Sequence, residues 1–483
     1  MTSPPQTRTA FGTPQLQRRQ LAIGLASAGL LTLVPAAALA TPSPLVRNVT
    51  GLYSVAVARI ETPRSASEVS RALRAWPGRV AVGGGHYSMG GQVAIEGGLQ
   101  LDMRQMKQLV WLRPDALRVR VQAGMRWRDL QDLLDPLDLA AKTMQSFANF
   151  TIGGAVSVNC HGRYVGHGPV GHSVQALQLV LADGQVVECS RSERAELFGA
   201  AIGGYGAVGV ITEVELELAR NVRIERVVQE LSLADYPEHF QSEVLGRGDS
   251  LLHNADLMAP HFDRPVSVTW RRSDKPLTEP ARLVPRNARY GLEQNLIWAM
   301  TELPGGAQLR QSVIHPLLSA RPAVKWLNHE ASLDVAELEP RTRRMSTYVL
   351  QEFFIPPRHF LGFAKGMAKV LKAREVMALN VSIRHAPADT LSCLPWAREE
   401  VFCFVLYFKQ RSHAAALERV GLWTRELIEL CLAHEGRYYL PYQPHATRAQ
   451  FERAYPEAQT LGRIKRDVDP EGKLSNQLWA RYL

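Results

Sequence analysis

Cysteine is scarce in this sequence, with five residues among 483. They are odd in number, far apart in the chain and never spaced as C-x-x-C: Cys160, Cys189, Cys393, Cys403 and Cys431. Disulfide-stapled domains and structural zinc sites need paired or closely spaced cysteines. The sequence therefore argues against a disulfide framework and predicts no metal site. Cys403 lies in the apolar stretch 401–408, which is typical of a buried structural thiol.

Signals for two common nucleotide folds and for nucleic-acid binding are also missing. No G-x-G-x-x-G motif opens a predicted helix, and no Gly-Lys-Ser/Thr follows a glycine loop, which excludes the Rossmann and P-loop folds. The formal charge of +10 is spread along the chain, without a basic run interleaved with aromatic residues. We therefore predict no nucleic-acid partner. The chain also lacks a repeat of fixed period and a low-complexity linker.

The N-terminus has the pattern of an export signal. Arg18-Arg19 precedes the mostly apolar stretch 21–40, which ends on Ala38-Leu39-Ala40. A charged start, a short apolar stretch and a small-residue site are typical of a cleaved signal peptide, and the paired arginines suggest the twin-arginine route. We predict cleavage after residue 40 and an exported protein, periplasmic or extracellular, without a stable membrane anchor. An uncleaved transmembrane anchor is the alternative.

The remaining chain indicates two sheet-containing regions and a tail. Residues 54–218 show short strands separated by glycine turns, with a helix capped by Ser65 and a hairpin around 182–184. Residues 213–218 alternate and predict a half-buried strand. Beyond 225, strands are predicted at 266–270, 348–355, 380–385 and 401–408 between longer helical stretches. The predicted boundaries are 1–40, 41–224, 225–435 and 436–483, and the predicted fold class is α+β.

Three glycine clusters fall in the first region, at 83–91, 151–155 and 202–209. Glycine permits a positive φ and lacks a Cβ, so consecutive glycines can turn their amides toward an anion and let it approach the backbone. A diphosphate is the ligand that this arrangement suits. The alternative is that the three clusters are unrelated turns, and for any single cluster a simple turn would be the better interpretation.

The clusters and their neighbours resemble a known family. Four segments are similar, in order, to the FAD domain of the vanillyl-alcohol oxidase and p-cresol methylhydroxylase superfamily: GGGHYSMGGQ at 83–92, TIGGA at 151–155 leading to NCHG at 159–162, the hairpin around Asp183-Gly184, and ELF at 196–198 with 202–211. The tail, at 439–442, 451–456 and 469–470, resembles decaprenylphosphoryl-ribose oxidase and sugar-lactone oxidases; cytokinin dehydrogenases are further similar members. The resemblance implies a two-subdomain FAD-binding domain of the p-cresol methylhydroxylase type and a substrate (cap) domain on an antiparallel sheet, with the tail returning to the FAD domain.

The resemblance also implies which residues contact FAD. Carried over by motif, the contacts fall on Gly83, Gly84, Gly85, His86, Tyr87, Ser88, Gly90, Gly153, Gly154, His161, Gly162 and Ile211. Many relatives bond a histidine immediately before this serine covalently to the flavin, but here Tyr87 occupies that position. In an extended loop, adjacent side chains point to opposite sides, so His86 should miss the flavin. Noncovalent FAD is therefore favoured, and a covalent link through His86 in a slipped loop is the alternative.

Four residues are candidates for catalysis. Glu352 interrupts a predicted apolar strand, where burying a charged side chain is costly unless it has a function. The alternative is that Glu352 faces solvent from an edge strand. Arg384 ends another strand and could pair with Glu352 or hold an anionic substrate group. Tyr442 and Gln443 lie in the tail loop, where the ribose oxidase carries a lysine. His161 beside Cys160 is interpreted as a loop element at the flavin rather than a nucleophilic pair.

These observations predict an exported FAD-dependent oxidase or dehydrogenase. It would take a hydride from a CH–OH carbon, or as a second possibility a CH–NH carbon, of a small polar substrate such as a sugar, polyol or lactone. Oxygen or another electron acceptor would then take the electrons. The alternative is a catalytically silent flavin- or ligand-binding protein of the same fold.

Overall fold

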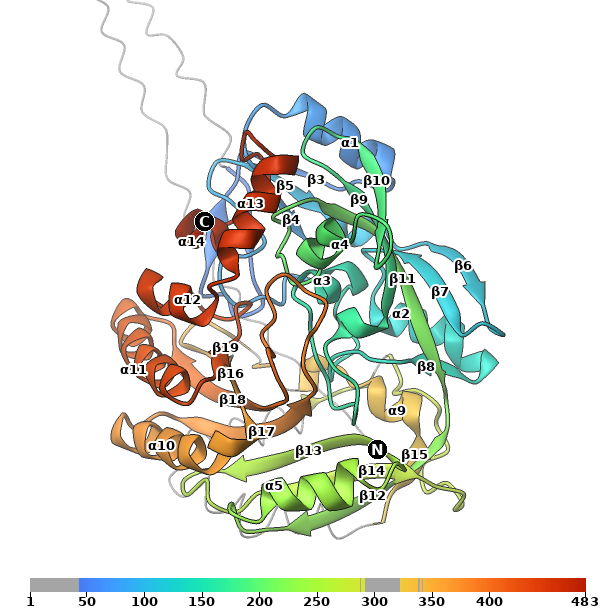
Figure 1. The fold of residues 1–483 in the computed structure, drawn as a ribbon, viewed down its shortest axis with the longest axis vertical. Helices are drawn as coiled ribbons and strands as arrows, with labels where there is room; N and C mark the ends of the chain where they lie inside the picture. Colours follow the sequence, from blue (N-terminus) through green and yellow to red (C-terminus); the bar gives the residue numbers. More distant parts are fainter. Residues whose placement is uncertain (1–42, 287, 292–321, 338, 341) are drawn as a thin grey trace, which may run out of the picture. The chain divides into compact units, whose positions relative to one another are not determined.

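The computed structural model describes residues 43–483 apart from 287, 292–321, 338 and 341 (Figure 1). The predicted signal segment, 1–40, lies outside the described residues. Among the helices that are described, none combines the length and apolarity needed to cross a membrane.

The first sheet is parallel and positions the first glycine cluster. Its strand order is β3 (Arg59–Glu61), β5 (Leu99–Asp102), β4 (Val80–Gly83), and α1 (Ala66–Ala75) connects β3 to β4. The cap of α1 is confirmed, because Ser65 Oγ accepts from the Glu68 amide at 3.2 Å. β4 ends at Gly83, so the glycine loop leaves the carboxyl end of a buried strand. A separate antiparallel pair joins β1 (Leu45–Arg47) and β2 (Ser54–Ala56).

The second sheet is antiparallel, in the order β10-β9-β11-β7-β6, with β8 added to the far end of β11. Its strands are β6 (Leu109–Arg113), β7 (Arg118–Gln122), β8 (Leu139–Ala141), β9 (Val174–Val180), β10 (Val186–Ser190) and β11 (Val210–Arg220). The predicted hairpin is confirmed, and Gly184 supplies its positive φ of 82°. The half-buried strand at 213–218 is confirmed within β11. Three helices accompany this sheet: α2 (Trp127–Leu134), α3 (Ile152–Ser157) and α4 (Ala195–Ala201).

Within the described residues, the third sheet has eight strands, and all their pairs are antiparallel. Its order is β15 (Val324–Trp326), β12 (Arg223–Glu230), β14 (Val266–Arg272), β13 (Ser250–Met258), β17 (Ala378–Ala386), β18 (Val401–Arg411), β16 (Ser346–Ile355) and β19 (Arg437–Tyr438). The four predicted strands correspond to β14, β16, β17 and β18. The expectation of helical stretches elsewhere was wrong for β12, β13 and β15. β12 and β13 carry polar residues at several positions, so they show little apolar alternation, and β15 is only three residues long.

One face of this sheet packs on helices. α10 (Phe360–Ala373) and α11 (Ala414–Ala433) lie side by side next to strands β16 to β18 (Figure 1). Phe404 of β18 contacts Phe360 and Phe363 of α10, with ring centroids 5.2 and 5.0 Å apart. These phenylalanines are fully buried, so this face forms core and the side chains at alternate positions point the other way. The short helices α5 (Tyr236–His239) and α9 (Leu327–Ala331) complete this region.

The tail contains α12 (Arg448–Ala454), α13 (Ala458–Val468) and α14 (Trp479–Tyr482). Trp479 Nε1 donates to the Gly204 carbonyl at 3.0 Å, and Asn476 Nδ2 donates to the Tyr205 carbonyl at 2.8 Å. The Val80 amide donates to the Lys473 carbonyl at 2.7 Å. The C-terminus therefore contacts both the first sheet and the third glycine cluster.

A buried polar network joins the second sheet to the third. Asn328 of α9 donates from Nδ2 to Asp135 Oδ1 at 2.8 Å and to the Leu139 carbonyl at 2.9 Å. We expect Asn328→Ala to lower the free energy of unfolding by about 2 kcal/mol, because two buried acceptors each lose a donor. Urea unfolding measured at equal flavin content would check this. Asp138→Asn is the control, since this exposed partner of Arg282 should change stability by less than about 0.5 kcal/mol; equal losses would contradict the role of Asn328.

Candidate active site

A cavity of about 460 Å³ lies between the glycine segments and the third sheet. One wall contains residues 84–89 and 153–155, and the other contains side chains from β13, β16, β17 and β18. Residues far apart in the sequence thus face the same space. The sheet contributes its free face, which is the face opposite α10 and α11.

The glycine wall is built by backbone segments that touch. A Cβ on Gly84 would lie 2.2 Å from Thr151 Oγ1, and a Cβ on Gly153 would lie 2.5 Å from the Cβ of Ala123 and 2.9 Å from its carbonyl oxygen. Both distances are well below van der Waals contact. Glycine is therefore required where the first two clusters approach their neighbours.

Nine of the predicted cofactor residues line the cavity: Gly84, Gly85, His86, Tyr87, Ser88, Gly153, Gly154, His161 and Ile211. Gly83, Gly90 and Gly162 lie behind its wall. A Cβ on Gly83 would meet the side chains of Gln100 and His86, and one on Gly162 would lie 2.0 Å from the Met144 carbonyl oxygen. These three glycines allow close packing rather than contact with the cavity.

Several polar atoms of the lining are buried and have no protein partner within the described part of the chain. They are His86 Nε2, Ser146 Oγ, Thr151 Oγ1, Arg343 Nε and Arg384 Nε. Buried polar atoms are rarely left without a hydrogen bond, because the desolvation cost is not recovered. Their convergence on one cavity indicates a polar ligand.

The loop at His86 is not extended. His86 has a φ of 60°, and its Nδ1 lies 3.3 Å from the Arg47 carbonyl oxygen, while the Tyr87 ring packs on Phe150 with centroids 4.3 Å apart. The expectation that adjacent side chains point to opposite sides was therefore wrong here, because a left-handed residue breaks that alternation. Burial and nearby Arg104 lower the pKa of His86, so the ring is neutral at neutral pH.

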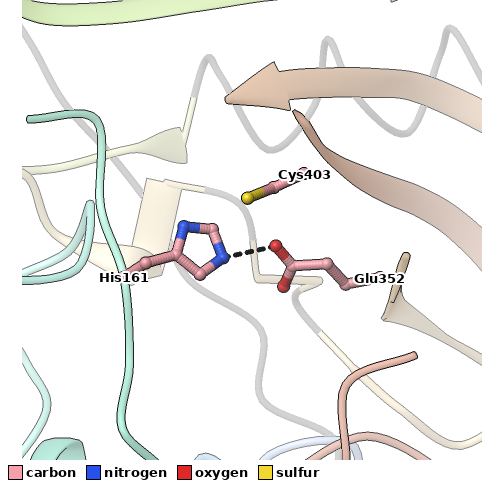
Figure 2. Close-up of side chains that lie close together, drawn as sticks. All are labelled: His161, Glu352 and Cys403. Atoms are coloured by element: carbon pink, nitrogen blue, oxygen red, sulfur yellow. Dashed lines mark hydrogen bonds and ion pairs between the residues drawn. The ribbon is translucent and has the colours of Figure 1, made fainter. Parts of the chain in front are cut away.

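Glu352 forms the acidic centre of the cavity. It comes from β16, its side chain is 2% exposed, and its Oε1 is hydrogen-bonded to His161 Nε2 (Figure 2). Its Oε2 accepts from the Tyr442 hydroxyl at 3.2 Å. Burial, with the charge of Glu352 as the next cause, raises the pKa of Tyr442 well above its ordinary value, so the phenol remains a neutral donor. The solvent-facing alternative for Glu352 is thus wrong.

Arg384 lines the same cavity from β17 but is not paired with Glu352. In the described part of the chain its guanidinium has no hydrogen bond or ion pair, and its Nε is buried. Burial lowers the pKa of Arg384 and the charge of Glu352 opposes this, but a guanidinium stays charged. Arg384 was expected either to pair with Glu352 or to hold an anionic substrate group. Since the pairing is not observed, the second role remains as the expectation.

The structure does not place Gln443 on the cavity. Gln443 is buried, donates from Nε2 to Gln410 Oε1 at 2.8 Å and accepts from the Tyr53 hydroxyl at 3.3 Å. Its neighbour Tyr442 reaches the cavity, so the tail loop contributes one of the two predicted residues.

Sequence reasoning missed much of the sheet wall. The missed lining residues from the sheet are Asn254, Tyr348, Leu350, Leu379, Asn380, Ser382, Val405 and Tyr407. Asp256 accepts from the side-chain amides of Asn254 and Asn380, at 3.3 and 3.2 Å, which leaves their carbonyl oxygens available to other donors. The polar alternation Asn380, Ser382, Arg384 was the one signal that could have revealed this wall, because every second residue of a strand shares a face.

His161, Glu352 and Cys403 offer ligand atoms within 4.8 Å of one another (Figure 2). Burial and Glu352 raise the pKa of the Cys403 thiol well above its ordinary value, so the thiol beside the carboxylate is neutral. Burial likewise raises the pKa of Cys160, whose Sγ donates to Gln145 Oε1 at 3.0 Å. The trio is therefore interpreted as a hydrogen-bonded acid centre beside a neutral thiol.

Comparisons with known proteins identify an FAD-binding region in this chain. A family model described as an FAD binding domain matches residues 57–190. L-gulonolactone oxidase of Bos taurus is 26% identical over 433 residues, covering 86% of this chain and 92% of the relative. Cytokinin dehydrogenase 5 of Arabidopsis thaliana is 32% identical over 168 residues (32% of this chain, 31% of the relative), and alditol oxidase of a Streptomyces species is 31% identical over 180 residues (36% and 42%). The predicted FAD-binding domain and its cofactor are confirmed.

The walls of the cavity fit FAD. The glycine segments offer backbone to a diphosphate, and the unpartnered atoms of His86, Ser146 and Thr151 suit a ligand rich in oxygen atoms.

A methyl group on the glycine wall should reduce flavin binding. We expect Gly153→Ala to lower the flavin bound per mole of protein several-fold, because the new Cβ collides with Ala123. Visible absorbance of the purified protein measures this. Gly462→Ala is the matched control, since its Cβ would meet Arg466 at an ordinary 3.5 Å; unchanged flavin content in Gly153→Ala would show that this approach is not part of the cofactor wall.

Proposed function

Because the chain belongs to the FAD-linked oxidoreductases that carry a p-cresol methylhydroxylase-type FAD-binding domain, we propose that it oxidises a CH–OH carbon of a small polyhydroxylated substrate, such as a sugar, alditol or sugar lactone. The observation that carries this proposal is the buried carboxylate of Glu352, which lines the cavity between two hydrogen-bond partners. A silent flavin-binding protein would have no need to keep such a group at the cavity.

The glycine wall would hold the cofactor. Residues 84–88, Gly153 and Gly154 would contact its diphosphate and ring system, with Ser146 and Thr151 donating hydrogen bonds. Bound FAD supplies the acceptor for the hydride that leaves the substrate carbon.

Glu352 would take the hydroxyl proton of the substrate. A carboxylate has about four lone-pair directions, and His161 and Tyr442 use one on each oxygen, so acceptor capacity remains on the cavity side. Both partners can donate to the charged form and so keep Glu352 able to accept a proton. Loss of the hydroxyl proton to Glu352 would leave electron density on the substrate oxygen and drive the hydride from its carbon.

Arg384 and the two asparagines would position the substrate. The unpartnered guanidinium suits a carbonyl, carboxylate or developing negative charge. The carbonyl oxygens of Asn254 and Asn380, left free by Asp256, suit hydroxyl donors. A wall with a cation and several acceptors matches a sugar, alditol or lactone better than an amine, which would have to lie beside Arg384.

Further parts of the proposal concern the whole chain. Residues 41–224 and 436–483 would form the two-subdomain FAD-binding domain, and 225–435 the substrate domain. Oxygen would be the electron acceptor, as the names of the relatives suggest, and residues 1–40 would direct export. Hydrogen peroxide formed per substrate oxidised distinguishes an oxidase from a dehydrogenase that uses another acceptor.

Glu352→Gln tests the base. We expect the rate of flavin reduction by a sugar lactone or alditol to fall about 10²–10⁴-fold with flavin content unchanged, because the amide cannot take a proton. Anaerobic bleaching of the flavin in a stopped-flow instrument measures this rate. Glu435→Gln, at an exposed carboxylate paired with Arg358, is the control and should keep the rate. If Glu352→Gln reduces flavin as fast as the unchanged protein, another group is the base.

Acid precipitation tests whether the flavin is bound covalently or noncovalently. His86 Nδ1 is directed to the Arg47 carbonyl, and Tyr87 occupies the position of the linking histidine in the similar family, so we expect acid precipitation to release the yellow colour into the supernatant. Colour in the pellet that His86→Ala moves to the supernatant would instead identify a covalent link at His86.

A further inference from the structure

We propose that His161 is a positioning residue that holds the carboxylate of Glu352 in place and directed at the substrate, a role distinct from its place in the cofactor wall. This inference rests on the proposed function, in which Glu352 is the base. Its basis is the hydrogen bond between His161 Nε2 and Glu352 Oε1, which joins residues 191 positions apart (Figure 2).

The His161 ring is fixed by its surroundings. It is 6% exposed, and its centroid lies 5.0 Å from Trp396, 5.8 Å from Phe354 and 6.2 Å from Tyr439. The backbone before it is anchored as well, because the Trp396 indole donates to the Asn159 carbonyl and the Tyr439 hydroxyl donates to the Val158 carbonyl, both at 2.8 Å. A ring held on this many sides can set the orientation of the carboxylate it contacts.

The geometry assigns the two residues of the pair, His161 and Glu352, different tasks. His161 Nδ1 lies 3.4 Å from the carbonyl oxygen of the next residue, Gly162, and its Nε2 is occupied by Glu352. Neither nitrogen is left to take a proton from the substrate. In a nucleophilic triad a carboxylate orients a reacting histidine; here the histidine orients a reacting carboxylate.

His161 is one of two side chains that hydrogen-bond to Glu352 among the described titratable groups around it. The titratable side chains that interact with Glu352 across the described site are His161, Cys160, Tyr205, Arg384, Cys403, Tyr439, Tyr442 and Tyr455. The thiols and phenols are neutral, since burial raises the pKa of each. Arg384 carries a positive charge but makes no hydrogen bond to Glu352, so the hydrogen bonds that orient the carboxylate come from His161 and Tyr442.

The first test is kinetic. In His161→Gln we expect flavin reduction to slow about 10- to 100-fold, a size typical of lost second-layer partners, with flavin content unchanged and the substrate KM altered less than about threefold. Because His161 acts through Glu352, the loss should appear in the rate of flavin reduction and not in substrate binding. His167→Gln, an exposed histidine of the same loop, is the control and should change neither.

The second test separates the pairing from the chemistry. The double variant His161→Gln/Glu352→Gln should be no slower than Glu352→Gln alone, because His161 acts through Glu352. NMR of protein labelled with ¹³C-histidine tests the pairing directly. The His161 resonance is the one that is absent in His161→Gln. Its chemical shift should change in Glu352→Gln and stay the same in Glu435→Gln.

The outcomes distinguish the two proposals. If His161→Gln loses flavin but its remaining flavin is reduced at the unchanged rate, or if the double variant is additive, His161 belongs to the cofactor wall alone and the inference is overturned. If the unchanged protein reduces no flavin with sugars, alditols or lactones, the proposed function fails, while the resonance shift in Glu352→Gln still reports whether His161 and Glu352 are paired.

Discussion

A charged carboxylate buried where three chain segments meet is the constraint on which this structure depends. Glu352 is 2% exposed, and an isolated ionised carboxylate is costly to bury. Its oxygens are satisfied by His161, from the segment after α3, and by Tyr442, from the C-terminal tail. All three segments must therefore be in place before the carboxylate has its partners. The completed cofactor wall, the substrate wall and the tail thus depend on one another, and the site is assembled only in the fully folded chain.

The alternation of side chains along the strands of the third sheet determines which residues reach Glu352 and the cavity. In β16, β17 and β18 alternate residues face either the helices or the cavity, so Phe353 and Phe404 enter the core while Glu352 and Arg384 face the ligand. A slip of one residue would exchange the two faces and bury the guanidinium of Arg384 among phenylalanines. The packing of α10 and α11 therefore fixes the register that aims the polar groups. Stability and chemistry occupy opposite faces of the same strands.

The parts that sequence could predict are those with local causes. The Ser65 cap, the hairpin at Gly184 and the alternating β11 each depend on neighbouring residues. The first two glycine clusters coincide with close approach between chain segments, at Gly84 and Gly153. β13 was not recognised because Asn254 and Asp256 interrupt its apolar pattern, and the partner of Asp256 on the neighbouring strand, Asn380, is distant in the sequence. The left-handed backbone at His86 and the pairing of His161 with Glu352 also have no local signal, since the partners come from distant segments.

The tyrosine in the tail loop decides where the positive charge of the cavity lies. A lysine at position 442 could have given Glu352 a cationic partner from the tail, whereas the buried phenol donates a hydrogen bond and adds no charge. Arg163 and Arg343 line the cavity but are paired with Glu330 and Glu339. Among the described lining residues, this leaves Arg384 as the arginine without a partner. Glu352 and Arg384 then stand on different strands, in the order β16-β18-β17. In the proposed reaction, the proton would leave toward Glu352 while negative charge develops facing Arg384.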